Sequence, residues 1–247
     1  MIEAFDLYLE WIDMDQDDLN KPTYGASSHY LSNAGDAYFT EKRTFGQLSA
    51  AWNLPLWLPY ITPHDSVLDF GCGGGYLLNL LPARKKVGVD INPAARSQAQ
   101  SLGLSVYPTM DDLPPERYTR IISSHALEHV PHPLIVLQSI QRFLDPHGLL
   151  LLLLPLDDWR NKSNRQYHND DSDHHLYTWT PQTIGNLLKE AGYEIKCIKI
   201  VSDAMPVNTL MVRLAQRYTF SRRFLGWAMS VVLLRRQVFG VAYHTPS

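Results

Sequence analysis

A glycine-rich turn after a short apolar segment is the part of this sequence that most clearly predicts a ligand site. Residues 66–70 form an apolar run that contains Asp69, and glycine then occupies alternate positions at Gly71, Gly73 and Gly75. Because glycine lacks a Cβ, the backbone can turn tightly at these positions and approach a bound molecule closely. We therefore predict a strand, a ligand-binding loop and a helix, in that order.

The spacing of these glycines excludes two common nucleotide motifs. A dinucleotide fingerprint, Gly-x-Gly-x-x-Gly starting at Gly71, would need a glycine where the chain has Tyr76. A P-loop would end in Gly-Lys-Ser or Gly-Lys-Thr, and this turn does not. The spacing that remains is Asp-x-Gly-x-Gly-x-Gly, from Asp69 to Gly75.

A second carboxylate follows at the distance expected for a nucleoside site. Residues 86–91 predict another short strand, which includes Asp90, and Asn92-Pro93 predicts the start of the next helix. In α/β nucleotide sites, an acid about 20 residues after the glycine loop binds the ribose hydroxyls. A carboxylate suits this role because its two oxygens accept hydrogen bonds from both hydroxyls of a diol.

A third group contains histidine and glutamate residues that could act as a general base or bind a metal. We predict that His125, Glu128 and His129 share one turn of helix, because they lie at positions i, i+3 and i+4. Histidine is the side chain best suited to act as a general base near neutral pH, and histidine with carboxylate also binds metals. The candidate bases are His125, His129, His168 and His175, and an ordinary structural role is open for each of them. We expect His129 and His175 to be the catalytic pair and expect no metal; a bound metal would use His125, Glu128, His129 and His175.

Strand and helix patterns alternate along the rest of the chain. This alternation predicts a parallel sheet with helices on both faces, and ligands then bind at the carboxyl ends of the strands. The predicted strands are 66–70, 86–91, 104–107, 119–124, 148–154, 193–201 and 237–243, and the predicted helices are 36–60, 75–82, 93–102, 132–143 and 180–191.

Taken together, these motifs resemble those of the class I S-adenosylmethionine (SAM)-dependent methyltransferases. The glycine loop resembles their first motif, 127–130 (Leu-Glu-His-Val) resembles the segment after their fourth strand, and 143–154 resembles the turn and strand that follow. The resemblance covers roughly residues 60–200 and the strand at 237–243. It implies a Rossmann-like α/β fold with a seven-stranded, mostly parallel sheet whose last strand is antiparallel.

The resemblance also implies roles for individual residues, with SAM as the cofactor. Asp69 would orient the loop and the methionine amino end, the glycines would line the methionine moiety, and Asp90 would hold the ribose. Ile91 would pack on the adenine, and Met110 and Asp111 would frame it. The cofactor-binding residues expected on this basis are Asp69, Gly71, Gly73, Asp90, Ile91, Met110, Asp111 and His125.

The activity that this resemblance implies is methyl transfer to a small-molecule or saccharide acceptor, at oxygen. One alternative is a metal-assisted RNA 2′-O-methyltransferase, because His125-x-x-Glu128-His129 resembles a Glu-x-x-Glu-His segment of such enzymes, with His125 replacing the first glutamate. That segment also occurs in ubiquinone-pathway O-methyltransferases. A second alternative is a non-catalytic SAM-binding accessory protein. The net charge of −3 argues against a nucleic-acid partner, and the intact loop with Asp90 argues against a non-catalytic role.

The length of 247 residues predicts one domain with additions. We expect an N-terminal extension, 1–60, that caps the SAM site, and a methyltransferase domain, 61–247. Within that domain, 155–178 would form an active-site lid and 202–236 a helical insertion. An apolar run at 224–234 has two arginines on each side, so the insertion would either pack on its own domain or contact a membrane surface peripherally. The run is too short to span a bilayer, which takes about 20 residues.

The overall composition indicates a folded protein and a cellular compartment. Hydrophobic residues make up 45% of the chain, which is enough for a full core, and no leader segment is expected at the N-terminus. The two cysteines, Cys72 and Cys197, provide no disulfide framework. This composition predicts a cytoplasmic location, where thiols stay reduced.

Overall fold

A computed structural model of the chain describes most of the predicted domain. The described residues are 33–156, 166–168, 171, 173–203, 205, 224, 226–228, 230–231 and 235–244. The first part of the predicted extension, the middle of the predicted lid and most of the predicted insertion lie outside the described residues. Within the described part, no helix is both long and apolar enough to cross a membrane.

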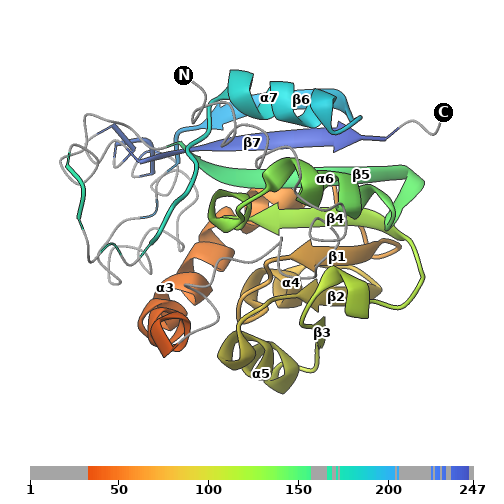
Figure 1. Ribbon diagram of the computed structural model, residues 1–247, viewed down its shortest axis with the longest axis horizontal. Helices are drawn as coiled ribbons and strands as arrows, with labels where there is room; N and C mark the ends of the chain where they lie inside the picture. The colour runs from red at the N-terminus through yellow and green to blue at the C-terminus, as the bar shows by residue number, and fades with distance from the viewer. Residues whose placement is uncertain are drawn as a thin grey trace, which may run out of the picture.

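Seven strands form one sheet in the order β3-β2-β1-β4-β5-β7-β6 (Figure 1). All pairings are parallel except those of β7, which runs antiparallel to both β5 and β6. This arrangement confirms the predicted fold. The strands are β1 (Ser66–Phe70), β2 (Lys85–Val89), β3 (Ser105–Tyr107), β4 (Tyr118–Ser124), β5 (Leu144–Leu156), β6 (Glu194–Val201) and β7 (Arg236–Tyr243).

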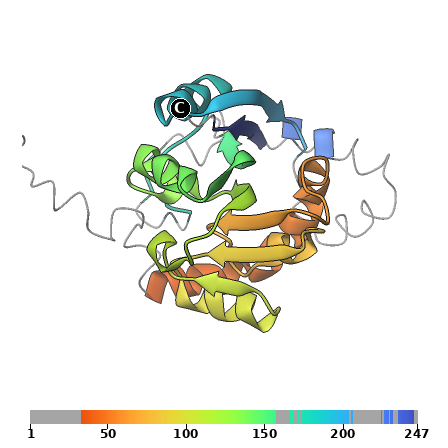
Figure 2. The ribbon, with the colours of Figure 1, turned by 90° about the vertical axis from the view of Figure 1, so that its right-hand side faces the viewer.

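Helices cover both faces of the sheet (Figure 2). One face carries α3 (Asn33–Trp57), α4 (Tyr76–Leu80) and α5 (Pro93–Ser101), and the other carries α6 (Pro133–Gln141) and α7 (Pro181–Glu190). Two 3-10 helices, η3 (Met110–Asp112) and η4 (Leu127–His129), follow β3 and β4.

The leucine run of β5 shows why the central strands are apolar at every position. Leu150, Leu152 and Leu154 pack in the core under α6 and α7, whereas Leu151 and Leu153 pack in the core under α3 and α4. A strand that is covered on both faces cannot alternate apolar and polar residues, because both sets of side chains are buried.

Most observed elements differ from the predicted ranges by one to three residues at an end, and the N-terminal helix ends at Trp57 rather than at residue 60. Helix α4 and strand β5 are two further cases. Helix α4 ends at Leu80 rather than at residue 82, since Leu81 is already extended and Pro82 follows it. Strand β5 begins four residues earlier than predicted, and its pairing with β4 shifts register between Tyr118 and Arg120.

The helix starts follow the predicted capping signals. The Asn92 side chain accepts a hydrogen bond from the Ala95 amide at 2.8 Å, with Pro93 next in the first turn of α5. The Thr180 hydroxyl accepts one from the Thr183 amide at 3.1 Å at the start of α7. Side-chain caps of this kind satisfy amides that have no partner within the helix.

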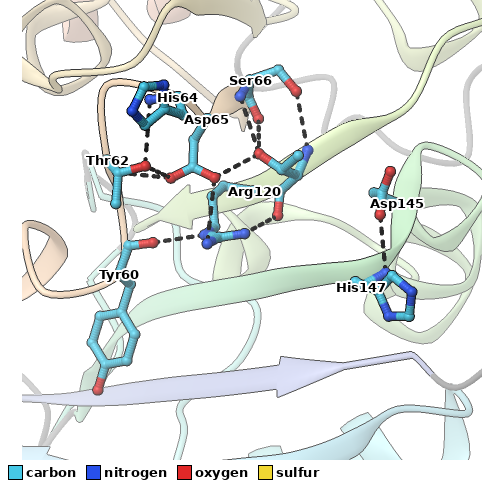
Figure 3. A network of polar contacts seen from close by, with 9 residues as sticks. Tyr60, Thr62, His64, Asp65, Ser66, Arg120, Asp145 and His147 are labelled. Atoms are coloured by element: carbon cyan, nitrogen blue, oxygen red, sulfur yellow. Dashed lines mark hydrogen bonds and ion pairs between the residues drawn. The ribbon is translucent and has the colours of Figure 1, made fainter.

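A buried carboxylate joins the segment after α3 to the starts of β1 and β4 (Figure 3). Asp65 Oδ2 accepts from the amide and the hydroxyl of Thr62, both at 2.7 Å, and Oδ1 accepts from the Thr119 hydroxyl at 2.8 Å. Arg120 Nη2 lies 3.3 Å from the same oxygen, and Arg120 Nε donates to the Tyr60 carbonyl at 2.6 Å. The network therefore fixes the end of the N-terminal helix at the amino edge of the sheet.

We predict that Asp65→Ala lowers the free energy of unfolding by about 3 kcal/mol, because it leaves buried donors without an acceptor. Burial disfavours the charge, but the hydrogen bonds from Thr62 and Thr119 and the charge of Arg120 outweigh it and hold the Asp65 pKa below its usual range. The stability that Asp65 contributes should therefore be present near neutral pH and be lost as the pH falls through this lowered pKa. Urea unfolding of wild type and variant over a pH series measures both effects.

Asp145→Ala is the matched control, because the Asp145 side chain accepts a hydrogen bond from the His147 amide at 3.0 Å on the surface, outside the buried network. It should change stability by less than about 1 kcal/mol. Equal losses for the two variants would contradict the role assigned to the buried network.

Candidate active site

The loop after β1 turns through three glycines in the left-handed region. Gly71, Gly73 and Gly75 have φ angles of 75°, 52° and 73°. The loop is held against the neighbouring strand, because the amides of Gly71 and Cys72 both donate to the Val89 carbonyl, at 2.8 and 3.0 Å. Left-handed backbone at three alternate positions explains the glycine spacing in the sequence.

The three glycines border different surroundings. A Cβ on Gly71 would lie 2.4 Å from Ala126 Cβ, and one on Gly75 would lie 2.5 Å from Leu104 Cδ1. A Cβ on Gly73 would meet no atom within 4 Å. Gly71 and Gly75 therefore permit close packing inside the protein, whereas Gly73 faces open space where a ligand can approach.

Asp90 connects this loop to the end of β2. Its Oδ2 accepts from the Gly73 amide at 2.7 Å and its Oδ1 from the Asn92 amide at 2.9 Å. The Arg96 guanidinium donates to the carbonyls of Asp90 and Ile91, at 2.9 and 2.6 Å. Burial raises the Asp90 pKa, against the lowering effect of these amides and of Arg96. A carboxylate has about four acceptor positions, so Asp90 retains capacity for two more donors.

Asp69 lies beneath the loop with an unsatisfied oxygen. Its side chain is buried, and Oδ1 has no hydrogen-bond donor among the described residues. Burial, together with the charge of Asp90, raises the Asp69 pKa to about 8. Buried polar atoms rarely lack partners, so an orphaned oxygen next to an open loop is compatible with a ligand group at this place.

The adenine-framing residues predicted from the sequence lie after β3. Met110 packs against the core below α6. The exposed Asp111 carboxylate lies 3.8 Å from the Arg142 guanidinium. Both residues line a surface hollow of about 340 Å³ with Leu113 and Phe143.

The polar group after β4 differs locally from the predicted helical turn. His125 has a φ of 54°, in the left-handed region, and 3-10 helix η4 begins only at Leu127. The prediction that His125, Glu128 and His129 share one turn of helix was therefore wrong. The reason is that the His125 amide still pairs with the Leu153 carbonyl of β5, at 2.8 Å, so the chain turns sharply at the end of the strand.

His125 nevertheless contacts Glu128 and a residue distant in sequence. His125 Nε2 lies 2.7 Å from Gln237 Oε1, and Nδ1 lies 3.4 Å from Glu128 Oε1. Gln237 belongs to β7, and its amide nitrogen lies 3.5 Å from Asn53 Oδ1 of α3. No local signal in the sequence indicates Gln237, because only the β5–β7 pairing brings it to this edge of the sheet.

Glu128, His129 and His175 converge next to this contact. Glu128 is fully buried, and its Oε1 lies 3.4 Å from His125 Nδ1 and 3.9 Å from His129 Nε2. The rings of His129 and His175 are 5.0 Å apart between centroids. One ligand atom from each of the three residues lies within 4.8 Å of the other two, an arrangement that could hold a metal ion. His125 and His168 are not part of this triad.

The two histidines beside Glu128 have opposite tendencies to bind a proton. Burial disfavours charge on His125, but the hydrogen bond and charge of Glu128, with help from Gln237, outweigh it and raise the His125 pKa. Burial dominates at His129 and lowers its pKa, despite the Glu128 charge. His125 therefore binds a proton more readily than His129.

Comparison with known proteins identifies the family. The methyltransferase domain family matches residues 42–198, which is more than half of the chain. The chain belongs to the methyltransferase domain family. The cofactor is S-adenosylmethionine, as expected from the glycine loop.

The curated relatives share part of their length with this chain. A ubiquinone biosynthesis O-methyltransferase of Actinobacillus pleuropneumoniae is 33% identical over 118 residues, covering 39% of this chain and 50% of that protein. A protein of the same name from Cereibacter sphaeroides is 31% identical over 134 residues, covering 50% of this chain and 52% of that protein. The chain thus spans about half the length of the curated relatives it matches.

Solved structures show the same fold. A methyltransferase in complex with the Trm112 activator of Haloferax volcanii matches with a TM-score of 0.60 and 18% identity, over 89% of this chain and 100% of that one. A SAM-dependent methyltransferase of Archaeoglobus fulgidus matches with a TM-score of 0.57 and 19% identity, over 83% and 98%.

The residues at the loop fit SAM chemically. The open space beside Gly73 provides room for the methionine chain, and the buried carboxyl of Asp69 offers an unpaired acceptor for a cationic group. Asp90 has acceptor capacity left for a diol.

We predict that Gly73→Val abolishes measurable SAM binding while the protein stays folded, because the added side chain fills open space next to the loop. Gly103→Val is the matched control: Gly103 also has a positive φ, 81°, and open space around its Cβ position, but it lies in the turn before β3. Calorimetry should show a dissociation constant for SAM raised more than tenfold, equivalent to about 1.4 kcal/mol or more, for the first variant alone. Equal weakening in both variants would mean that backbone strain, and not contact, explains the glycine.

We predict that Asp69→Asn changes how stability depends on pH. The raised pKa means that folded Asp69 holds its proton up to about pH 8, whereas the unfolded chain loses it near pH 4. The contribution of Asp69 to wild-type stability should therefore fall as the pH rises from about 4 to 8, by about 1.4 kcal/mol per unit of pKa difference. Asparagine stays neutral in both states, so the variant should lack this decline in urea unfolding without SAM. Parallel pH profiles for the two proteins would contradict the assignment.

Proposed function

We propose that this protein transfers a methyl group from SAM to a hydroxyl oxygen of a small-molecule acceptor, with saccharides included in that class. The observation that carries the proposal is the half-buried His129, whose pKa is lowered by burial, beside the buried Glu128, at the same edge of the sheet as the glycine loop. The two parts are adjacent, because Ala126 of the histidine segment packs directly on Gly71. The names of the curated relatives, which are O-methyltransferases, support oxygen as the acceptor atom.

We assign the cofactor-binding roles as the family resemblance implies them, and the open space beside Gly73 and the unpaired oxygen of Asp69 support them. Asp69 would pair with the methionine ammonium, Gly71 and Gly73 would line the methionine chain, and Asp90 would accept from the ribose hydroxyls. Ile91, Met110 and Asp111 would surround the adenine, and His125 would border the site from the end of β4. Bound SAM supplies the methyl group as an electrophilic sulfonium, so the protein has to position and deprotonate the acceptor.

His129 is the general base in this proposal. Its imidazole would accept the hydroxyl proton while the acceptor oxygen attacks the methyl carbon, and Glu128 would stabilise the resulting imidazolium. The raised pKa of His125 and the lowered pKa of His129 favour a proton on His125 and leave His129 as the better base. His175, with its ring 5.0 Å from that of His129, would hold the acceptor against the base.

A metal-assisted reaction is the second candidate, and the convergence of Glu128, His129 and His175 favours it. A divalent ion at these three residues would polarise the acceptor hydroxyl and replace the base. This version includes the RNA 2′-hydroxyl as an acceptor, although the net charge of −3 provides little attraction for RNA.

We predict that His129→Ala lowers kcat by about 100-fold or more, the range of general acid–base catalysis, while the SAM dissociation constant stays unchanged. The assay measures S-adenosylhomocysteine release with a panel of hydroxylated small molecules and saccharides. His132→Ala, at an exposed histidine three residues away, should keep wild-type activity. Wild-type activity should fall as the pH drops through the lowered His129 pKa, because the protonated ring cannot act as a base.

Elemental analysis and chelator treatment separate the two versions of the mechanism. Full activity of metal-free protein supports the base, whereas stoichiometric metal that disappears in His129→Ala, together with its activity, supports the metal. Methylation of amine acceptors alone would contradict the proposed acceptor class.

A further inference from the structure

Charge is distributed unevenly along the chain. Residues 204–236 contain no acidic residue and no lysine, but include six arginines, Arg213, Arg217, Arg222, Arg223, Arg235 and Arg236. The whole chain has a net charge of −3, so this segment is a basic region in an otherwise acidic protein. Such a region attracts negatively charged surfaces.

The same segment exposes a set of large apolar side chains. The described residues between 224 and 231 are helical, and Phe224, Trp227 and Val231 are 62%, 54% and 55% exposed. Their spacing of three and four residues places them on one face of a helix. The rings of Phe224 and Trp227 lie 6.2 Å apart between centroids, so the two aromatics are adjacent on this face.

The opposite face of the segment is anchored on the domain. A Cβ on Gly226 would lie 3.1 Å from the Trp52 ring of α3, and Ser230 is buried. The Trp52 indole nitrogen donates to the Asp203 carboxylate at 3.1 Å. The contact with the domain therefore uses Gly226 and Ser230, which leaves Phe224, Trp227 and Val231 facing outward.

We propose that the apolar face of Phe224, Trp227 and Val231 docks on a membrane surface that contains anionic lipid. The run at 224–234 has no charged residue, and arginine pairs flank it on both sides. Apolar and aromatic side chains with flanking arginines suit the boundary between headgroups and acyl chains. Anionic headgroups complement the arginines, and the uninterrupted apolar run distinguishes this surface from a nucleic-acid site, where basic residues are interspersed.

The docked face would lie close to the candidate active site. Trp52 contacts Gly226, and its neighbour Asn53 is in contact with Gln237, which in turn contacts His125. Docking through this segment would thus bring the polar end of β4 near the lipid surface. The proposal does not depend on the reaction, because the face and its charge are independent of the acceptor.

Sedimentation of the full-length chain with vesicles tests the proposal. We expect partitioning at least tenfold stronger with mixed phosphatidylcholine and phosphatidylglycerol than with phosphatidylcholine alone, and weaker binding as salt is raised. The double variant Phe224→Ser/Trp227→Ser should lower the partition coefficient more than tenfold. The triple variant Arg222→Gln/Arg223→Gln/Arg235→Gln should lower it by a similar factor. Phe45→Ser is the control, because Phe45 is an aromatic residue of α3 with a similar exposure of 49%.

A conservative variant keeps the test valid if the serine variant does not fold. Brominated lipid should quench part of the wild-type tryptophan fluorescence, and Trp227→Phe should remove that quenched component. Unfolding midpoints and SAM affinity serve as folding controls for every variant.

Three results would overturn the proposal. The first is wild-type protein that does not sediment with anionic vesicles, or that sediments equally with neutral ones. The second is a stable dimer that the Phe224 and Trp227 variant dissociates, without vesicle binding, which would make the face a contact between two copies. The third is binding of single-stranded RNA that needs the arginines in the absence of vesicle binding.

Discussion

The close approach between the loop after β1 and the segment after β4 is the contact on which the candidate site depends. It is possible because Gly71 has no Cβ: an added Cβ would lie 2.4 Å from that of Ala126. The contact brings the glycine loop and the histidine segment to the same edge of the sheet. Without it, the proposed cofactor-binding loop and the proposed base would be separated.

Buried carboxylates concentrate at this edge, and each is compensated differently. Asp90 accepts two backbone amides, Glu128 lies beside two histidines, and Asp69 keeps a proton because burial raises its pKa to about 8. Burying an unpaired charge is costly, so these groups are stable only as neutral acids, with partners, or with a bound cation.

The amino ends of β1 and β4, helix α3 and the insertion have structural roles. Asp65 and Arg120 hold the end of α3 at the amino edge of β1 and β4, away from the candidate site. Helix α3 then covers one face of the sheet and provides Trp52, on which Gly226 of the insertion packs. This chain of contacts connects the N-terminal helix, the insertion and the edge of the sheet that carries the candidate site.

Local signals in the sequence determined most of the fold. The glycine spacing, the acid after β2, the caps at Asn92 and Thr180, and the leucines of β5 each depend on near neighbours or on burial of a whole strand, so they were predictable. Tertiary structure decided the rest. Only strand pairing places Gln237 beside His125, and only packing separates Gly73, which faces open space, from Gly71, which contacts Ala126. The left-handed turn at His125 was also not predictable, because its amide is still paired with the Leu153 carbonyl of β5 when the chain turns, and this pairing is a tertiary contact.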